Sequence, residues 1–394
     1  MKNGKILKML SFLGICLLFG LMFAVNGIAA TEGEEIILRK TVIGVYQADG
    51  SILYVPQEDP ARNRQAIEYL LENDESKTLI FPSGQTIEVE AVIDIGDNTT
   101  IIADGATIIQ VNDGLGLIKH TVDKVGYKSI SHVTIQGGTW KNAVNNKGCT
   151  MFRFVHGSDL NFKDVTIETN YQGHALELIA CKDVIVEGCQ LYAANDATKS
   201  KDSVEEALQI DIATPKTAPG VLASTGDEKF VKGQTCSNIT IKNCTVSGSR
   251  GICANFASSE SKYKNKFHTN ITITNCKATG ESAEGIVLFN TVGATIKNCT
   301  IRSNSTRKDE AYSIGLHLAL MGKNKISTEY TNIISGNKIY GYRQALQIYS
   351  HTSSQYGKTT VKNNKAWASK KETAYQLKSC KKLVNSKNTA KKRT

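Results

Sequence analysis

Proline is scarce in this chain of 394 residues, and its five prolines all lie outside the strand-like segments that repeat along the sequence: Pro56, Pro60, Pro82, Pro215 and Pro219. Proline has no backbone N–H to donate, so within sheets it is confined to edges, strand starts and bulges. Its absence from the repeated segments predicts strands that are hydrogen-bonded on both sides.

Aromatic residues are also few, at 7% of the chain with two tryptophans. A groove that binds sugar rings usually offers aromatic side chains as platforms, so their scarcity disfavours a pure binding role. No nucleic-acid-binding module is recognisable, and the basic C-terminal segment has no interleaved aromatic residues. Nucleic acid is therefore not a predicted partner.

Long hydrophobic runs are missing except at the N-terminus. There, three lysines precede an apolar stretch from Met9 to Val25, and small residues follow up to Ala30. This order is typical of a secretory signal peptide, so we expect residues 1–30 to be removed and the protein to be secreted, extracellular or at the cell surface, without a membrane partner after cleavage. A retained membrane anchor is the alternative reading.

The formal net charge of +10 is concentrated at the two ends of the chain. The leader carries three lysines and no acid, and residues 378–394 carry seven basic residues and no acid, which leaves residues 31–377 neutral overall. A segment like 378–394 is usually a solvated, disordered tail. We expect such a tail, with weak attraction to an anionic cell wall as its functional alternative.

Two strand-like segments alternate along most of the sequence. The first is rich in Val, Ile, Thr and Asn and recurs at 159–168, 183–191, 237–246, 269–278, 293–301 and 331–339. The second is an apolar run at 174–180, 206–212, 251–256, 285–290, 314–320 and 345–350. Each unit is too small to bury its own apolar face, so the units must stack.

The repeats predict an all-β fold, a right-handed parallel β-helix, because parallel crossovers are almost always right-handed. Residues 61–73 have helical spacing of apolar residues and precede strand-like segments at 79–89 and 98–111. A short N-terminal helix of this kind can cover the otherwise open first coil. We therefore expect one domain over residues 31–377, capped by this helix.

Cysteine and asparagine recur at the bend after the first strand. Cys189, Cys244, Cys276 and Cys299 occupy equivalent places in successive units and are expected to form a ladder of buried thiols rather than a metal site. The odd number of cysteines outside the leader also argues against a complete disulfide framework. A second ladder of hydrogen-bonded amides is expected from Asn243, Asn275, Asn298, Asn337 and Asn364.

The first coils carry a recognisable pattern, with PSG at 82–84 before an Ile-rich strand and NTTIIADGATI at 98–108 after it. This pattern resembles the pectin-lyase-like superfamily of secreted right-handed β-helix proteins, over most of residues 60–370. The resemblance implies a carbohydrate ligand, because most members are polysaccharide lyases, glycoside hydrolases or uronate epimerases, and some are non-catalytic surface or phage-tail proteins. The motif sets of polygalacturonases and of calcium pectate lyases are missing, so pectin is not implied.

Aligning the second strands of the repeats predicts a polar stripe on the outer face of the solenoid. One column contains Arg153, Glu177, Gln209, Leu288, His317 and Gln347, and two positions further on, hence on the same face, lie Asp211, Asn290 and Tyr349. A groove for an extended glycan is expected there, walled by residues 213–236 and by the loop 194–205, in which Asn195 and Asp196 lead to Glu205 and Glu206.

Glu177 and Asp211 are the predicted catalytic pair. They lie on adjacent coils and are offset by two positions, so a ~4.8 Å strand spacing and a ~6.6 Å offset put their Cα atoms about 8 Å apart. Glycoside hydrolysis needs one protonated and one ionised carboxyl group. Arg153 would hold Glu177 ionised, Asp211 or His174 would carry the proton, and Glu206 is the reserve acid. The predicted substrate-binding residues are Arg153, Gln209, Arg250, His268, Asn290, His317, Gln347 and Tyr349.

Two other functions remain open from the sequence. A polysaccharide lyase would need a base and a cation for a uronic acid, supplied by Arg250, Lys266, His174 or Arg153, with calcium held by Glu177 and Asp211. The hydrolase, in contrast, needs no cofactor. A non-catalytic carbohydrate-binding or cell-surface protein is the third possibility, with the polar stripe as an ordinary solvent face. Convergence of Glu177 and Asp211 in a walled cleft would distinguish the enzymes from the binder.

Overall fold

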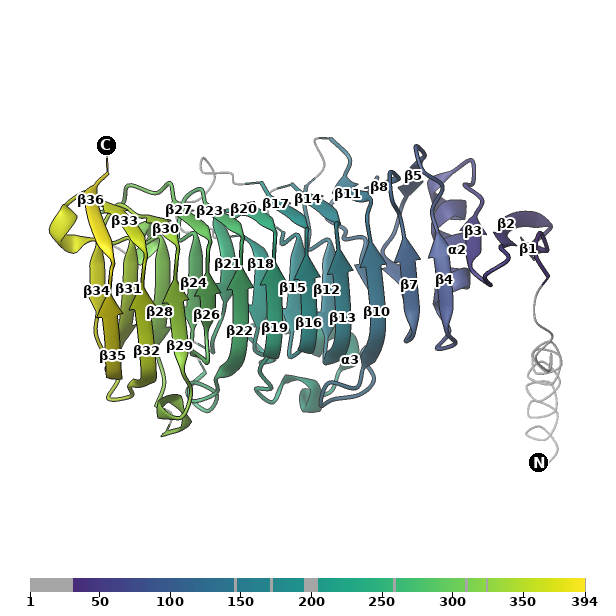
Figure 1. Ribbon diagram of the computed structural model, residues 1–394. Coiled ribbons are helices and arrows are strands. Elements are labelled where there is room, and N and C mark those ends of the chain that lie inside the picture. Colours follow the sequence, from purple (N-terminus) through teal and green to yellow (C-terminus); the bar gives the residue numbers. More distant parts are fainter. Residues whose placement is uncertain are drawn as a thin grey trace, which may run out of the picture.

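The computed structural model describes residues 31–144, 147–170, 173–194, 205–257, 260–308, 311–323 and 325–393. Within them the chain winds into an elongated solenoid of stacked coils (Figure 1). The predicted right-handed parallel β-helix is confirmed. The expected signal peptide, residues 1–30, lies outside the described residues and stays a prediction. Among the described residues, no helix has the length and apolarity that crossing a bilayer requires.

Each coil contributes one strand to each of three sheets, which we call A, B and C. Sheet A begins with three antiparallel strands and continues as parallel strands. Its strands are β1 (Glu35–Leu38), β2 (Thr41–Tyr46), β3 (Ile52–Tyr54), β4 (Lys77–Ile80), β7 (Thr99–Ile102), β10 (Ile130–Gln136), β13 (Gly157–Lys163), β16 (Lys182–Glu187), β19 (Ser237–Lys242), β22 (His268–Thr274), β25 (Thr291–Val292), β26 (Thr295–Lys297), β29 (Asn332–Ser335), β32 (Tyr356–Lys362) and β35 (Cys380–Ser386).

Sheets B and C are parallel throughout. Sheet B consists of β5 (Thr86–Val89), β8 (Thr107–Gln110), β11 (Thr139–Asn142), β14 (Thr166–Thr169), β17 (Gln190–Ala193), β20 (Thr245–Gly248), β23 (Lys277–Gly280), β27 (Thr300–Ser303), β30 (Lys338–Tyr340), β33 (Lys365–Ala368) and β36 (Thr389–Lys392). Sheet C consists of β6 (Ile93–Asp94), β9 (Ile118–Lys119), β12 (Phe152–Val155), β15 (Leu176–Ile179), β18 (Glu206–Asp211), β21 (Arg250–Ala254), β24 (Ile286–Phe289), β28 (Leu316–Leu320), β31 (Leu346–Ser350) and β34 (Tyr375–Leu377).

Helix α2 (Pro60–Leu71) covers the N-terminal end of the solenoid, as the sequence predicted (Figure 1). It begins where the Asp59 side chain accepts a hydrogen bond from the Arg62 N–H, with Pro60 in the first turn. Ala66, Ile67, Leu70 and Leu71 are buried against the first coils. The remaining helices are α3 (Pro219–Thr225) and the short 3₁₀ turns η1 (Glu228–Val231), η2 (Ala311–Ser313), η3 (Lys325–Thr328) and η4 (Lys371–Thr373).

The bend between sheets A and B is built by a residue with positive φ that recurs from coil to coil. This position holds Gly188, Asn243, Asn275, Asn298, Gly336, Asn363 and Lys387. Glycine and asparagine adopt this left-handed conformation most readily, which explains their recurrence in the sequence. The bend turns the next residue of each coil into the interior.

That next residue forms one continuous ladder, which begins with cysteine and ends with asparagine. The predicted thiol ladder is confirmed, and all nine described cysteines are free. The backbone N–H of Cys276 donates to Cys299 Sγ at 3.4 Å, and the N–H of Cys299 then donates to Asn337 Oδ1 at 2.9 Å. The same pattern continues through Asn364 and Asn388.

The predicted single asparagine ladder was therefore wrong, because it merged two neighbouring positions. Asn243, Asn275 and Asn298 are the bend residues with positive φ, whereas Asn337 and Asn364 are buried and continue the cysteine ladder. The two positions were confused because the repeat changes from Asn-Cys in the earlier coils to Gly-Asn at residues 336–337.

The predicted disordered tail at 378–394 was also wrong. Strand β35 pairs with β32 over six residue pairs, and β36 pairs with β33 over four, so residues 380–392 form a further coil. The lysines in these two strands, Lys381, Lys382, Lys391 and Lys392, masked the apolar pattern by which the earlier coils were recognised. The parallel β-helix thus extends beyond residue 377.

The amide ladder generates a stability prediction. Replacing Asn337 by alanine removes the acceptor of the Cys299 N–H in a fully buried position, and an unsatisfied buried donor costs about 1–3 kcal/mol. We expect Asn337→Ala to lower the free energy of unfolding by that amount in urea denaturation. Asn304→Ala, at an exposed asparagine, is the control and should change it by less than about 0.5 kcal/mol. Equal effects of the two variants would contradict the ladder's role.

Candidate active site on the outer face of sheet C

The outer column of sheet C is continuous in register over seven coils. Arg153 pairs with Glu177, Glu177 with Gln209, and Gln209 with Cys253. The column then continues through Val287, His317 and Gln347. Leu288, predicted in this column, instead pairs with Ala254 and packs in the core. A slip of one residue in the alignment of 285–290 moved it to the wrong face, because side chains alternate along a strand.

Arg153 and Glu177 form an ion pair between adjacent strands, as the sequence predicted. The guanidinium Nε donates to Glu177 Oε2, and Nη2 also contacts Thr150 Oγ1 at 3.3 Å. The Glu177 carboxylate raises the pKa of Arg153 above its usual range. Glu177 is 5% exposed, so the pair holds a carboxylate at the edge of the solvent.

Asp211 lies two residues beyond Gln209 on the same strand and is buried beside Glu177. The predicted offset is confirmed, because Glu177 pairs with Gln209 while Asp211 pairs with Ile179. Burial, and then the charge of Glu177, raise the pKa of Asp211 well above its usual value. Gln209 Nε2 donates to Asp211 Oδ2 at 3.3 Å, whereas Oδ1 is buried without a hydrogen-bond partner among the described residues.

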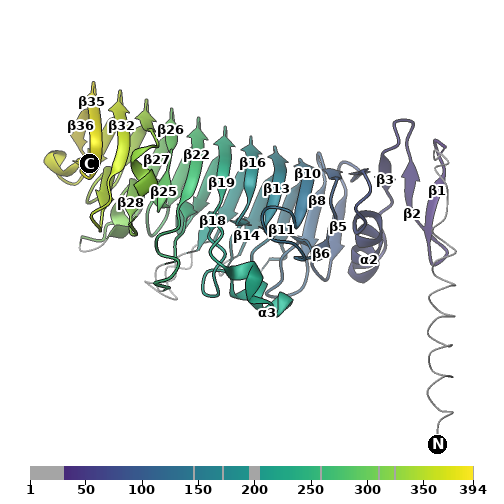
Figure 2. The ribbon, with the colours of Figure 1, turned by 90° about the horizontal axis from the view of Figure 1, so that it is seen from below.

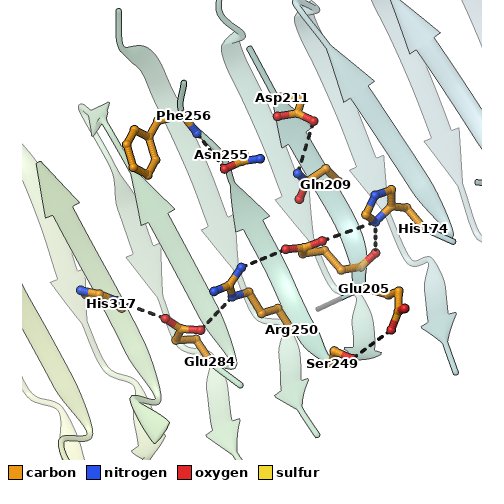
Figure 3. Close-up of polar contacts among 11 residues, drawn as sticks. His174, Glu205, Gln209, Asp211, Ser249, Arg250, Asn255, Phe256, Glu284 and His317 are labelled. Atoms are coloured by element: carbon orange, nitrogen blue, oxygen red, sulfur yellow. Dashed lines mark hydrogen bonds and ion pairs between the residues drawn. The ribbon is translucent and has the colours of Figure 1, made fainter. Parts of the chain in front are cut away.

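A row of alternating basic and acidic side chains crosses the strands next to this pair (Figure 3). His174 Nδ1 lies 3.6 Å from Glu206 Oε2, and Glu206 Oε1 accepts from Arg250 Nη1 at 3.0 Å. Arg250 Nε donates to Glu284 Oε2 at 2.8 Å, and Glu284 Oε1 lies 3.3 Å from His317 Nδ1. The predicted reserve acid Glu206 is thus held from both sides.

Glu284 is the buried central residue of this row of side chains, and its role was not predicted from the sequence. Its side chain is fully inaccessible, so burial acts to raise its pKa. The charge of Arg250 and the contacts with His317 act in the opposite direction and win, lowering the pKa of Glu284 to about 2. Glu284 precedes β24 in a connecting segment. It lies outside the apolar runs that were aligned to predict the outer column, so it was not predicted.

A cleft of about 350 Å³ lies on this face of sheet C. It brings together five residues predicted from the sequence, namely His174, Glu177, Glu206, Gln209 and Asp211, with five that were not, namely Lys216, Thr217, Asn255, Phe256 and Glu260. Asn255 could have been found, because it follows Ala254, the partner of Ile210, and so takes the place of Asp211 one coil on. The incorrect alignment had put Asn290 in that line.

The loop predicted to wall the groove does so. It carries α3 and η1, which pack through Ala218, Val221 and Phe230 on Val155 and Ile179 of sheet C. Figure 2 shows α3 projecting from the side of the solenoid. Lys216 and Thr217, which precede α3, line the cleft. The second predicted wall, at 194–205, lies outside the described residues except for Ala194 and Glu205.

Two predicted binding residues are structural instead. His268 is 1% exposed, and its ring nitrogens contact the Cys236 N–H and the Asn255 carbonyl oxygen. Burial lowers its pKa to about 4. Asn290 is 1% exposed, and its amide group joins the Lys264 carbonyl oxygen to the Met321 N–H. Both side chains satisfy backbone groups of loops and do not line the cleft.

The remaining predicted binding residues continue the outer face away from the cleft. Arg250 and His317 belong to the row of basic and acidic side chains, and Gln347 hydrogen-bonds to Gln376. Tyr349 packs edge-on against His351, with ring centroids 4.8 Å apart. The rings of Phe256 and Phe289 lie between the cleft and these residues, 5.2 Å apart. Sheet C therefore presents partly exposed rings beside the cleft, in spite of the low aromatic content.

Two further observations concern ligands. Among the described residues, no group of three or more His, Cys, Asp and Glu side chains could hold a metal ion. A larger cavity of about 470 Å³ lies beside α2 and is lined by carboxylates that include Glu68, Asp94 and Asp97. It is at the N-terminal cap and shares no residue with the cleft.

Comparison with known proteins agrees with this architecture. Residues 230–392 match the family described as right handed beta helix region. No curated protein matches the chain. The fold and this match are consistent with the predicted resemblance to the pectin-lyase-like superfamily.

Three solved structures illustrate the similarity. PfbA, a surface adhesin of Streptococcus pneumoniae, is 17% identical with a TM-score of 0.47, and the alignment covers 84% of this chain and 88% of that one. ORF18 of Geobacillus virus E2 is 14% identical with a TM-score of 0.49, covering 84% and 57% of the two chains. The A-module of the mannuronan C-5 epimerase AlgE6 from Azotobacter vinelandii is 12% identical with a TM-score of 0.37, covering 82% and 94%.

The buried charges generate a prediction for Glu284. Removing one partner of a buried ion pair leaves the other uncompensated and costs about 3 kcal/mol. We expect Glu284→Gln to lower the free energy of unfolding by that amount at pH 7. Because the folded-state pKa of about 2 lies below the ordinary value of 4.5, this contribution is complete above pH 4.5 and is lost as the pH falls toward 2.

Urea denaturation of both proteins between pH 7 and pH 2.5 measures this effect. The difference between Glu284→Gln and the unaltered protein should shrink as the pH falls. Glu168→Gln, at an exposed glutamate on sheet B, should follow the unaltered protein at every pH. A difference that does not depend on pH would contradict the assigned ion pair.

Substitution of Asp211, in contrast to that of Glu284, should raise the free energy of unfolding. The raised pKa of Asp211 means that ionisation at neutral pH opposes folding. We expect Asp211→Asn to raise the free energy of unfolding at pH 7, and to have little effect at pH 3, where the carboxyl is largely protonated in both states. Asp104→Asn, at an exposed aspartate, should show no such gain.

Proposed function

We propose that the cleft on sheet C hydrolyses a glycosidic bond in a polysaccharide, and that the protein acts outside the cell. The observation that carries this proposal is the pair formed by Asp211, whose pKa burial raises, and Glu177, which Arg153 pairs as a carboxylate. Two carboxyl groups in one cleft with opposed environments are the arrangement that general acid catalysis with an ionised partner requires. The inferred secretion and the β-helix fold supply the context.

In this mechanism Asp211 is the general acid. Its protonated carboxyl group, which Gln209 holds through Oδ2, would donate the proton to the leaving sugar oxygen at the floor of the cleft. Glu177 is the base or nucleophile, oriented by Arg153. Glu206 is fixed by His174 and Arg250 and supports the site electrostatically.

The charge of the cleft favours a neutral glycan as the substrate. Apart from Asp211, which acts here as a protonated acid, the carboxyl groups of Glu177, Glu206 and Glu260 line it, against the ammonium group of Lys216. A uronic acid would meet like charges there, and like charges repel strongly where water is excluded. A lyase that acts on uronic-acid glycans, with calcium on Glu177 and Asp211, is therefore the weaker candidate.

Non-catalytic binding is the alternative that one observation favours. Asp211 is only 3% exposed, so a substrate reaches it only at the floor of the cleft. The partly buried rings of Phe256 and Phe289 offer a surface on which a sugar can pack without any reaction. Binding of a neutral glycan without cleavage would support this alternative.

The test is a screen of the protein against neutral and uronic-acid polysaccharides, recording new reducing ends together with the absorbance of unsaturated uronides. We expect reducing ends without unsaturation on a neutral glycan. Glu177→Gln and Asp211→Asn should each lower the rate by about 10²-fold or more, since general acid–base catalysis contributes at least that factor. Glu168→Gln, on sheet B, should keep full activity.

The other outcomes are equally decisive. Unsaturated products would establish a lyase and reassign the two carboxyl groups. Activity that survives in both cleft variants would place the chemistry elsewhere on the molecule. Binding without any new reducing end across the panel would favour the non-catalytic alternative.

A further inference from the structure

The charge of this protein is strongly divided along the solenoid axis. Residues 331–394 contain fourteen lysines and arginines and a single acid, Glu372, which gives this segment a net charge of +13 against +10 for the whole chain. The preceding 330 residues are therefore net negative. The cationic segment is folded, because it forms the last three coils, from β29 to β36. We call these coils the cationic coils.

Four of the twelve lysines of the cationic coils are stacked in register, as two pairs. Lys338 pairs with Lys365 on sheet B, and Lys358 pairs with Lys382 on sheet A. All four side chains are exposed. Like charges directly opposite each other on neighbouring strands, about 4.8 Å apart, are destabilising. Among the described residues, none of the cations between 331 and 393 forms an ion pair, so this repulsion is not relieved within the chain.

A second column on sheet B adds further cations around two aromatic rings. The Arg302 guanidinium lies 4.2 Å from the Tyr340 ring centroid, and Tyr340 stacks on Trp367 with centroids 4.4 Å apart and an interplanar angle of 11°. Lys391 follows Trp367 in register. Burial, and then the charge of Arg302, lower the pKa of the adjacent Arg393. Positive charge is therefore crowded here as well.

These contacts disfavour some classes of ligand for the cationic coils. The ring faces of Tyr340 are occupied by Arg302 and Trp367, so they offer no platform for stacking nucleobases. The exposed large apolar side chains include only Leu383 in this segment, and no amphipathic helix is present among its described residues, which disfavours a membrane surface. Twelve of the fourteen cations are lysines, which act as point charges and do not require a planar bidentate ligand.

We propose that the outer faces of sheets A and B in the cationic coils bind a linear polysaccharide that carries repeated carboxylate groups. An extended chain along the solenoid axis would pass Lys338 and Lys365 on sheet B, or Lys358 and Lys382 on sheet A, and relieve the repulsion within that pair. This surface is separate from the cleft on sheet C, and the proposal holds whether or not the cleft is catalytic. The protein would then hold an anionic glycan with one end and present the cleft to a neutral one with its middle.

The experiment measures binding of the full chain to fluorescently labelled polygalacturonate at low ionic strength. We expect saturable binding that weakens steeply with added salt, as screening of exposed charges requires. The variant Lys338→Gln, Lys358→Gln, Lys365→Gln, Lys382→Gln should bind about tenfold more weakly or worse. Its thermal midpoint should not fall, because the substitutions remove like-charge contacts.

A matched control removes the same charge elsewhere. Lys128→Gln, Lys163→Gln, Lys232→Gln, Lys264→Gln alters four exposed lysines outside the cationic coils and should bind within about twofold of the unaltered protein. Equal losses in the two quadruple variants would overturn the proposal, because binding would then follow overall charge alone.

Two more arms separate this surface from the cleft and from other polyanions. Asp211→Asn should keep full affinity for polygalacturonate, and a loss of affinity in that variant would place the anionic glycan in the cleft and overturn the proposal. Binding to a DNA duplex of matched charge with no binding to polygalacturonate would assign the surface to nucleic acid instead. No saturable binding to polygalacturonate at any ionic strength would also reject it.

Discussion

The register between successive coils is the constraint on which the rest of this structure depends. Parallel backbone hydrogen bonds fix each strand directly above the one before it, so a residue type that recurs in the repeat recurs in space as a column. The bend residues with positive φ keep this register by turning sheet A into sheet B in the same way in every coil. Inside the bend, the Cys-to-Asn ladder gives each buried N–H an acceptor on the next coil.

The same stacking explains how the candidate site acquires unusual electrostatics on a flat sheet. Adjacent coils bring charged side chains within reach of each other, and the loop that carries α3 walls the cleft they line. Asp211 has a carboxylate neighbour and no cation of its own, so its pKa rises, whereas Glu284 has Arg250 and its pKa falls. Two buried carboxyl groups on one face of the solenoid thus have opposite proton affinities because of the partners that neighbouring coils supply.

A solenoid also allows separate surfaces on one domain, since each coil contacts only its neighbours. The acidic cleft lies in the middle of sheet C, and the cationic coils lie at the C-terminal end, where sheets A and B carry the lysines. Charge of one sign can therefore accumulate at one end without disturbing the other.

The fold and the buried thiol ladder could be predicted from the sequence, because a residue that recurs in the repeat recurs at the same place in each stacked coil. The N-terminal cap could be predicted from the helical spacing of its apolar residues. It also placed Glu177, Gln209 and Asp211 correctly, since their strands align without insertions. It misplaced Leu288 and Asn290, because a one-residue slip in a period-two strand changes the face and leaves the apolar pattern nearly intact. The last coil was missed for a different reason, because its repeated lysines interrupt the apolar pattern.

Only the tertiary structure decided what lies in the connecting segments. Glu284, Lys216 and Glu260 lie outside the aligned strands, and their positions depend on how loops of irregular length return to the sheet. The position of His268 also depends on a loop, which buries its side chain so that the ring contacts the Asn255 carbonyl oxygen. The repeat fixes where strands lie because backbone hydrogen bonds impose one spacing, whereas loops obey no such period, and the burial and charge partners that set a site's chemistry come largely from them.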